Sequence, residues 1–432
     1  MLKFLTFSIL LYAGVVSSKC DFIRKGVSHV PPQLPVHLRS NVWQAGFDEV
    51  HDGLCRNLRS PSRFFPGFRA HPGPPYKSAY LWDTAFISQI WMHWDPKIAE
   101  ELIKYVLKFQ KKDGKIHHAV LELVVKPYPY SESQPPLLAW ASWRIFEKSG
   151  DKKFLEQSYD KLKKYHEWMN RNRKNAEGLY FWIHPYESGI DNSPRFSNAS
   201  ESYKANTKKM AAVDLASYMG LSMEALAKMA RVLGKPQDET AFLKEYEDLK
   251  LLVNKKHWHA EDGTYYDWDY STSQFVRMNT ISNLTPMVAG FASTAQATEL
   301  MKHVMDPLRY NTLMPFPSVA KNDPSYSKDM WRGPVWVNMA YLGVLGVERY
   351  GYHKEASELA RRVVLGIYET YHQENYIFEF YDPERYDIVE LWRKKGNLWK
   401  RLTLGSKPVK NFVGWSGLAN TLVMEYGAEW SP

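Results

Sequence analysis

Apolar residues recur every three or four positions along most of the chain, which is the spacing of one face of an α-helix. One such face is formed by Ile98, Leu102, Tyr105, Val106 and Phe109, and a second by Leu155, Tyr159, Leu162, His166 and Met169. The same spacing predicts helices over residues 214–233, 240–257, 293–306, 338–350, 353–372 and 415–429. Strand-like alternation is scarce, so we predict an all-α protein.

Helices joined by short turns usually lie antiparallel, and the helices predicted here are compatible with six hairpins. Irregular stretches rich in Gly, Pro, Trp and acidic residues separate them, at residues 73–86, 126–136, 182–195, 316–336 and 377–383. Because loops on a rigid scaffold commonly carry function, we expect these stretches to converge on one mouth. No linker-like composition divides the chain, which predicts a single domain over residues 20–432.

Residues 1–19 combine an early lysine, a short apolar run and small residues, the pattern of a cleaved signal peptide. The run is too short to cross a bilayer, so we expect no stable membrane anchor. Secretion or delivery to an endomembrane or lysosomal lumen fits the sequons at Asn198 and Asn283. Cys20 and Cys55 are the only cysteines, and they are able to pair only if cleavage precedes Cys20.

Composition is that of a soluble globular protein, with 44% hydrophobic and 24% charged residues. The net charge of +9 is spread widely, and its one dense patch, residues 392–401, is predicted to be solvated loop. No nucleic-acid-binding motif accompanies the charge, so we expect no nucleic acid partner. The 16 Trp residues are more informative, because flat rings stack on the apolar face of a sugar.

Several chemistries lack their motifs: no H-E-x-x-H, C-x-x-C pair, P-loop or G-x-G-x-x-G is present, so neither a metal nor a cofactor is expected. Carboxylates set among aromatics remain, and hydrolysis of a glycosidic bond needs two carboxyl groups. In "ESGIDNSPR", Asp191 follows a Gly-hydrophobic step that aims it out of a tight turn, with Arg195 near enough to orient it. Glu379 lies between Phe378 and Phe380.

Structural explanations for the same residues stay open. Asp191 and Asp83 each have the sequence context of a helix N-cap. An isolated Glu379 is typically a surface group, and Trp331, Trp336 and Trp415 are typical of a buried core.

Six motifs, taken together, resemble glycoside hydrolase family 63, and most of all its short, single-domain members that act like mannosylglycerate hydrolase. They are "YLWDTAF", "SQPPLLAW", "ESGIDNSPR", "WRGPVWVNMAYL", "EFYDPE" and "FVGWSGL", in family order across roughly residues 60–425. The resemblance implies an (α/α)6 barrel. It also implies inverting hydrolysis of an α-glycosidic bond without a cofactor, on a small carbohydrate such as an oligosaccharide or a glycosylated small acid.

The resemblance also implies roles for individual residues. Asp191 matches the general acid and Glu379 the general base, which inversion places about 6.5–9.5 Å apart. The remaining matches contact the substrate: Asp83 and Gln134 as partners of sugar hydroxyls, Trp82, Trp331, Trp336 and Trp415 as ring platforms, Arg332 as a charge partner, and Glu187 as a binding or supporting carboxylate.

One departure from the family pattern and two alternative functions stay open. A long basic segment separates "EFYDPE" from "GWSGL", and its Lys394, Lys395, Lys400 and Arg401 predict preference for an acidic aglycone if they cover the pocket. The E-S-G-x-D and W-D-T patterns also fit a trehalase-like hydrolase of α,α-trehalose. A catalytically inactive sugar-binding protein is the third alternative.

Overall fold

The computed structural model describes residues 33–63, 65–121, 126–127, 131–196, 206–393, 402 and 405–430. Several sequence predictions lie outside these residues: the signal peptide over residues 1–19, Cys20, the sequon at Asn198, and the basic side chains Lys394, Lys395, Lys400 and Arg401. Cys55 is described, and it is buried within a helix.

Six helices form a closed inner ring. They are α2 (Leu81–Trp94), α4 (Leu138–Ser149), α7 (Val213–Val232), α9 (Thr285–Ala289), α11 (Val337–Arg349) and α14 (Leu418–Tyr426). Each packs against the next in this order, and α14 packs against α2 to close the ring. Both α2 and α7 bury residues around their whole circumference, as expected for helices enclosed by others.

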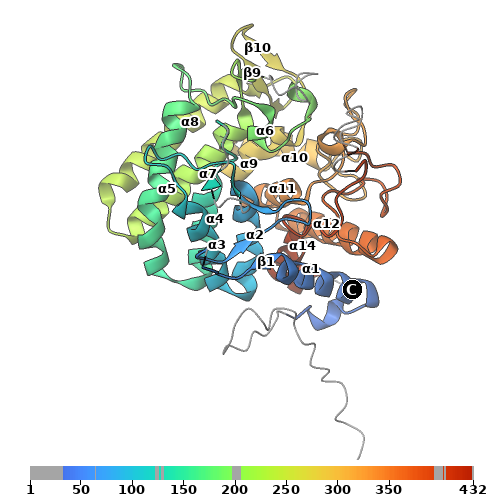
Figure 1. Ribbon diagram of the computed structural model, residues 1–432. Coiled ribbons are helices and arrows are strands. Elements are labelled where there is room, and N and C mark those ends of the chain that lie inside the picture. Colours follow the sequence, from blue (N-terminus) through green and yellow to red (C-terminus); the bar gives the residue numbers. More distant parts are fainter. Residues whose placement is uncertain are drawn as a thin grey trace, which may run out of the picture.

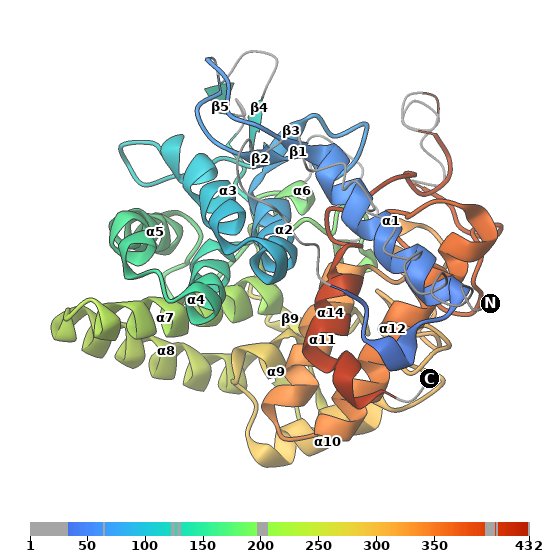
Figure 2. The same cartoon turned by 90° about the horizontal axis from the view of Figure 1, so that it is seen from below.

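A second set of helices alternates with the inner ones along the chain and surrounds them (Figure 2). It comprises α1 (Asn41–Asn57), α3 (Pro96–Lys108), α5 (Lys152–Asn172), α8 (Pro236–Lys256), α10 (Thr294–Val304) and α12 (His353–Glu374). These helices bury one stripe each; in α3 the stripe includes Ile98, Leu102, Tyr105 and Val106, as predicted. The predicted (α/α)6 barrel of hairpins is confirmed.

In the described residues, ten short strands lie in the loops and form small antiparallel sheets of two or three strands. They are β1 (Leu58–Arg59), β2 (Arg69–Ala70), β3 (Ser78–Tyr80), β4 (Ala119–Leu121), β5 (Lys126–Pro127), β6 (Met210–Ala211), β7 (Trp258–His259), β8 (Thr264–Tyr265), β9 (Asp267–Asp269) and β10 (Gln274–Val276). Figure 1 shows β9, β10 and the short helix α6 (Pro185–Ser188) at one end of the molecule, and α1 at the other. Pairing of Ser78 with Leu121 and Tyr80 with Ala119 fixes the entry of the chain into α2.

The periodicity missed helices as well as finding them. Residues 73–86 were predicted to be irregular, but α2 begins at Leu81 within this stretch, with Tyr80 as its N-cap. Asp83 therefore lies in the first turn of α2 and is not a cap. Because α2 is buried on nearly every side, its sequence does not alternate between an apolar and a polar face, and it shows no clear helical period.

The asparagine of the second sequon is buried in the folded chain: Asn283 is 3% exposed, and its amide donates to Met278 O at 2.9 Å. Among the helices of the described ranges, none is both long and apolar enough for a membrane span.

Candidate active site

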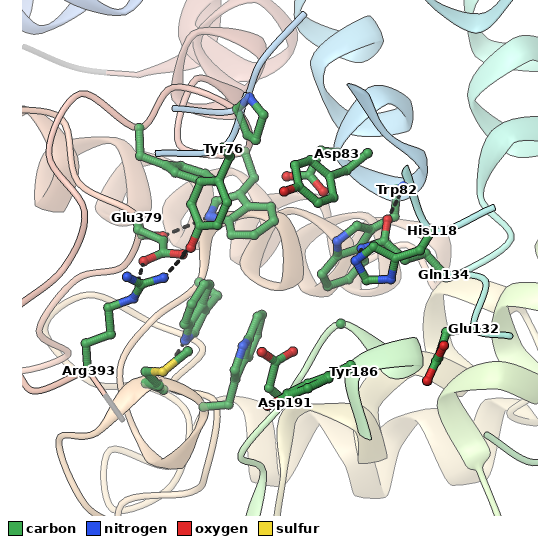
Figure 3. Close-up of a pocket in the computed structure, with 18 of the residues that line it drawn as sticks. Tyr76, Trp82, Asp83, His118, Glu132, Gln134, Tyr186, Asp191, Glu379 and Arg393 are labelled. Atoms are coloured by element: carbon green, nitrogen blue, oxygen red, sulfur yellow. Dashed lines mark hydrogen bonds and ion pairs between the residues drawn. The ribbon is translucent and has the colours of Figure 1, made fainter. Parts of the chain in front are cut away.

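A cavity of about 550 Å³ lies where inner helices α2, α11 and α14 begin (Figure 3). Its lining is aromatic and carboxylic: Pro72, Tyr76, Tyr80, Trp82, Asp83, His118, Glu132, Gln134, His184, Tyr186, Gly189, Asp191, Met330, Trp331, Trp336, Glu379, Arg393, Phe412 and Trp415. No group of His, Cys, Asp or Glu side chains suited to a metal ion occurs in the parts of the chain that the structure describes.

Asp191 reaches this cavity because a short helix ends at Gly189. Gly189 takes the left-handed conformation, with φ of 76°, that favours glycine at the end of a helix. A Cβ atom on Gly189 would overlap the ring of Trp82, so the position also requires the smallest residue. The turn that follows brings Asp191 to the cavity, where its carboxylate points inward (Figure 3).

The loop that carries Asp191 is anchored by the residues that follow Asp191. Asn192 Oδ1 accepts a hydrogen bond from Trp331 N at 2.9 Å, which ties this loop to a second side of the cavity. Arg195 is buried and pairs with Asp214 and Asp267. The prediction that Arg195 orients Asp191 directly is therefore wrong: its guanidinium faces α7 and β9 because two buried carboxylates hold it there.

Glu379 lies in the loop that follows α12, far from Asp191 in the sequence, and it is only 2% exposed. Its backbone N donates to Val409 O at 3.0 Å, and Trp415 Nε1 donates to its carbonyl oxygen at 2.8 Å. The phenol of Tyr76 donates to Oε1 at 2.6 Å, and Arg393 Nε lies 3.2 Å from Oε2. Glu379 is thus a buried carboxylate with two dedicated partners and not the surface group that it resembles in isolation.

The predicted tryptophans form one aromatic wall. Trp331 and Trp336 stack at 3.7 Å with 9° between their planes, Trp336 stacks on Phe380 at 4.8 Å, and Trp82 meets Trp415 edge-on at 5.7 Å. All four predicted platforms are nearly buried, yet each lines the cavity. The four tryptophan rings therefore belong both to the packed core and to the lining of the cavity.

Gln134 lines the cavity in an orientation set by its neighbours. Its Oε1 accepts from Trp82 N at 3.1 Å, and its Nε2 lies 3.2 Å from His118 Nε2. His118 Nδ1 lies 3.3 Å from Ser133 O, and burial lowers the pKa of His118. A neutral His118 that donates to Ser133 accepts the amide hydrogen of Gln134, which leaves the second amide hydrogen of Gln134 for a ligand.

Glu187 and Arg332 do not line the cavity, unlike the other predicted site residues. The carboxylate of Glu187 is fully buried and bonded to Arg173 at 2.7 Å, to Ser133 N at 2.7 Å and to Ile183 N at 3.0 Å. Glu187 thereby links the turn before Asp191 to the segment that carries Gln134. Its role is to support the cavity and not to line it. Arg332 is half-buried beside the tight turn at Gly333.

Removal of the cation opposite Glu187 is expected to destabilise the fold. In Arg173→Met, the Glu187 carboxylate stays buried without its counter-charge, which typically costs about 3–5 kcal/mol of unfolding free energy. The control is Arg171→Met, because Arg171 is 57% exposed and only 3.9 Å from Glu167, an ion pair worth about 0–1 kcal/mol. Urea unfolding measures both; equal losses would contradict the assignment of Glu187 as a structural anchor.

Asp83 lines the cavity at the first turn of α2 with a carboxyl that is 4% exposed. Burial, to which the charge of Glu379 adds, raises the pKa of Asp83 to about 8. Asp83 is therefore protonated at neutral pH, and its hydroxyl is a donor for a ligand oxygen.

The raised pKa of Asp83 predicts a pH-dependent effect of Asp83→Asn on stability. Between about pH 4 and pH 8 an unfolded Asp releases a proton that native Asp83 keeps, so the native state loses stability as pH rises through this window. The amide has no such penalty. The variant is thus expected to match the wild type near pH 4 and to exceed it by on the order of 5 kcal/mol above pH 8.

Thermal unfolding at pH 4, 6 and 8 measures this difference. Asp160→Asn is the matched control, because Asp160 is 76% exposed on α5 and its replacement is expected to have the same small effect at each pH. A stability difference between wild type and Asp83→Asn that does not change with pH would contradict the buried, protonated Asp83.

Sequence reasoning missed eight polar or aromatic residues of the lining: Tyr76, Tyr80, His118, Glu132, His184, Tyr186, Arg393 and Phe412. Tyr76 and Tyr80 precede the W-D-T triplet in a stretch already selected for its composition, so a signal existed for them. Arg393 had none. It begins the basic patch predicted to be solvated loop, yet its side chain is only 4% exposed, which corrects that prediction at this residue.

This chain is similar to known proteins in sequence and in fold. Residues 76–397 match the family model of the mannosylglycerate hydrolase MGH1-like glycoside hydrolase domain. A mannosylglycerate hydrolase of Rubrobacter radiotolerans is 25% identical over 73% of this chain and 88% of its own. Mannosyl-oligosaccharide glucosidase GCS1 of Arabidopsis thaliana is 23% identical over 83% of this chain and 49% of its own.

The solved structures include a mannosylglycerate hydrolase of glycoside hydrolase family 63 from Thermus thermophilus, in complex with Tris. It superposes with a TM-score of 0.71 at 20% identity, over 88% of this chain and 99% of that one, which supports the same barrel fold. The chain therefore belongs to the mannosylglycerate hydrolase MGH1-like members of glycoside hydrolase family 63 and is a glycoside hydrolase.

Proposed function

We propose that this glycoside hydrolase cleaves the α-glycosidic bond of a small glucoside or mannoside with inversion, with Asp191 as general acid and Glu379 as general base. One observation carries the proposal: two carboxylates from loops far apart in the sequence line the same cavity. The aromatic wall and the hydrogen-bonding groups of Asp83 and Gln134 beside them suit a sugar ring.

The proposed reaction passes one proton through each carboxyl group. Asp191 donates its proton to the glycosidic oxygen as the bond from that oxygen to the anomeric carbon breaks. Glu379 accepts a proton from a water molecule as the water oxygen bonds to the opposite face of that carbon. The product sugar then has the inverted configuration, and Asp191 and Glu379 exchange protons with solvent to restore the starting state.

The proposed glycone is glucose or mannose because the similar proteins named above are mannosylglycerate hydrolases and a mannosyl-oligosaccharide glucosidase. An acidic aglycone stays a prediction from composition, since the basic side chains that suggest it lie outside the described residues. Mannosylglycerate and its uncharged analogue mannosylglycerol form the matched pair that tests it. A preference for mannosylglycerate that salt weakens supports an acidic aglycone, and equal kcat/KM values contradict it.

A substrate panel tests the proposed function as a whole. It contains mannosylglycerate, glucosylglycerate, α-linked gluco- and manno-disaccharides, their β-linked counterparts and α,α-trehalose. The proposal expects turnover of at least one α-glucoside or α-mannoside and none of the β-linked set. Turnover of trehalose alone would support the trehalase-like alternative, and sugar binding without any turnover would support an inactive sugar-binding protein.

We also propose that the protein enters the secretory pathway, as the sequence of residues 1–19 suggests. Expression in eukaryotic cells followed by N-terminal sequencing of the mature protein tests this. A mature chain that begins near residue 20 is expected, whereas a chain retained in the cytosol with Met1 in place would contradict it.

A further inference from the structure

Arg393, Tyr76 and Glu379 each contact the other two (Figure 3). Arg393 Nε lies 3.2 Å from Glu379 Oε2 as an ion pair without the alignment of a hydrogen bond. Arg393 Nη2 donates to the oxygen of the Tyr76 phenol, and that phenol donates to Glu379 Oε1 at 2.6 Å. Arg393 thus reaches both carboxylate oxygens, one directly and one through Tyr76.

The contacts make the two oxygens of Glu379 unequal. A phenol has one hydrogen, and because Tyr76 accepts from Arg393, this hydrogen is directed at Oε1. Burial and the charge of Glu379 raise the pKa of Tyr76 well above its usual range, so the phenol keeps its proton. Oε2 is buried and accepts no hydrogen bond from the described residues. Oε1 keeps a second lone pair beyond the one that accepts from Tyr76, whereas Oε2 lies against the cation of Arg393.

The backbone holds Arg393 in this position. Trp392 N donates to Lys328 O at 2.8 Å, Met330 N donates to Trp392 O at 3.0 Å, and Arg393 N donates to Ser406 O at 3.0 Å. These bonds attach the segment that carries Arg393 to the loop that leads into Trp331. The long segment after "EFYDPE", which departs from the family pattern, thereby contributes a buried cation to the cavity.

We propose that Arg393 and Tyr76 are positioning residues for Glu379: they hold its carboxylate in one orientation and favour its ionised form, so that it accepts the proton of the attacking water. This inference rests on the base role proposed above for Glu379. The step balances, because one O–H bond of water breaks and its proton passes to the Glu379 carboxylate, while the water oxygen bonds to the anomeric carbon and the leaving oxygen takes the proton of Asp191.

The charges around Glu379 explain why such a cation is needed. Tyr76, Arg393 and Asp83 act on Glu379 directly, and Asp191 lies close enough to act on Arg393. Four carboxyl groups, those of Asp83, Glu132, Asp191 and Glu379, line one largely buried cavity. The guanidinium of Arg393 lies against Glu379 and supplies an opposite charge there. An opposite charge at this distance favours the ionised form of a carboxyl group.

The experiment compares pH profiles of kcat/KM for the wild type, Arg393→Gln, Arg393→Lys and Tyr76→Phe, with a glycosyl fluoride as substrate. Fluoride leaves with little help from an acid, so the acid limb of the profile reports the base. Arg393→Gln is expected to move this limb upward by about 1–2 pH units and to lower the plateau about 10–100-fold. Arg393→Lys keeps the charge and is expected to keep the limb within about 0.5 unit. Tyr76→Phe removes one donor to Oε1, and an upward shift of about 0.5 unit is expected.

A lower plateau with an unmoved acid limb in Arg393→Gln would overturn the inference, because a merely structural role changes activity without changing the titration. If Arg393→Gln does not fold, Tyr76→Phe gives the decision, and an unmoved limb there overturns it. Arg385→Gln is the control: Arg385 belongs to the same segment and pairs with Asp387, but it is 47% exposed outside the cavity, so its profile is expected to match the wild type.

Glu379→Gln in the same assay separates this inference from the proposed function. Wild-type activity in Glu379→Gln would refute the base role itself. Loss of activity in Glu379→Gln with an unmoved limb in both Arg393→Gln and Tyr76→Phe would refute only the role of the two partners.

Discussion

Replacing Asp191 with Asn is expected to lower kcat for an unactivated α-glycoside by about 10³-fold or more, because the leaving oxygen then departs without a proton. The loss is expected to be below about 10-fold for the corresponding glycosyl fluoride, whose leaving group needs little protonation. Asn has nearly the shape of Asp, so unfolding temperature and sugar binding are expected to change little. Steady-state kinetics on the two substrates measure the contrast directly.

The contrast between substrates carries this prediction more than the loss itself. A residue that only shapes the cavity would slow both substrates by the same factor. Equal losses on the glycoside and the fluoride would therefore contradict the acid role of Asp191. Asp160→Asn makes the same chemical change on an exposed face of α5 and is expected to leave both rates unchanged.

Replacing Glu379 is expected to have the second large effect and to show a different pattern. Glu379→Gln is expected to lower kcat by about 10³–10⁴-fold on the glycoside and on the fluoride alike, since both need an activated water. Glu379→Ala opens space beside Tyr76 and Trp415 while the partners of the backbone stay in place. Added azide, a nucleophile that needs no base, is expected to restore part of the activity and to yield the β-glycosyl azide from an α-linked substrate.

The azide product tests which face of the sugar Glu379 serves. Attack from the side of Glu379 inverts the anomeric centre, so the β-azide is the expected product by NMR. An α-azide, or rescue of Asp191→Asn as strong as that of Glu379→Ala, would contradict the assignment of the two roles.

Many helices were predictable from sequence, among them α3, which has one buried face, and the inner helices α7, α11 and α14. The apolar residues of α3 recur with the helical period because the opposite face of the helix is exposed to solvent. Helix α2 lacks this contrast, since it is enclosed by α3, α4 and α14 and buries residues all round. A pattern of polar and apolar residues records exposure, so it carries little information for a helix as enclosed as α2, which begins at the cavity.

The two acids of "ESGID" show what local sequence does not decide. Both Glu187 and Asp191 are carboxylates near a turn, and both were assigned to the site. The left-handed turn at Gly189 separates them: the side chain before it is locked by Arg173, and the one after it lines the cavity. Which acid faces which way depends on partners remote in the chain. The order of six motifs assigned the acid role to Asp191 where local reasoning favoured a helix cap.

Arg393 marks the opposite limit. In sequence it is the first of several neighbouring cations, and such runs are usually hydrated. Its burial follows from three backbone hydrogen bonds to residues 328, 330 and 406 and from the carboxylate of Glu379. None of these contacts is local in the chain, so composition alone gave the wrong environment for this residue.

The anomeric configuration of the first product is the most direct measurement of the account. Proton NMR during hydrolysis of an α-linked substrate, faster than mutarotation, distinguishes the two outcomes. If Glu379 activates water on the face opposite Asp191, the free sugar appears first as the β-anomer. Initial release of the α-anomer would mean that the configuration is retained, and it would contradict the roles given to both carboxylates.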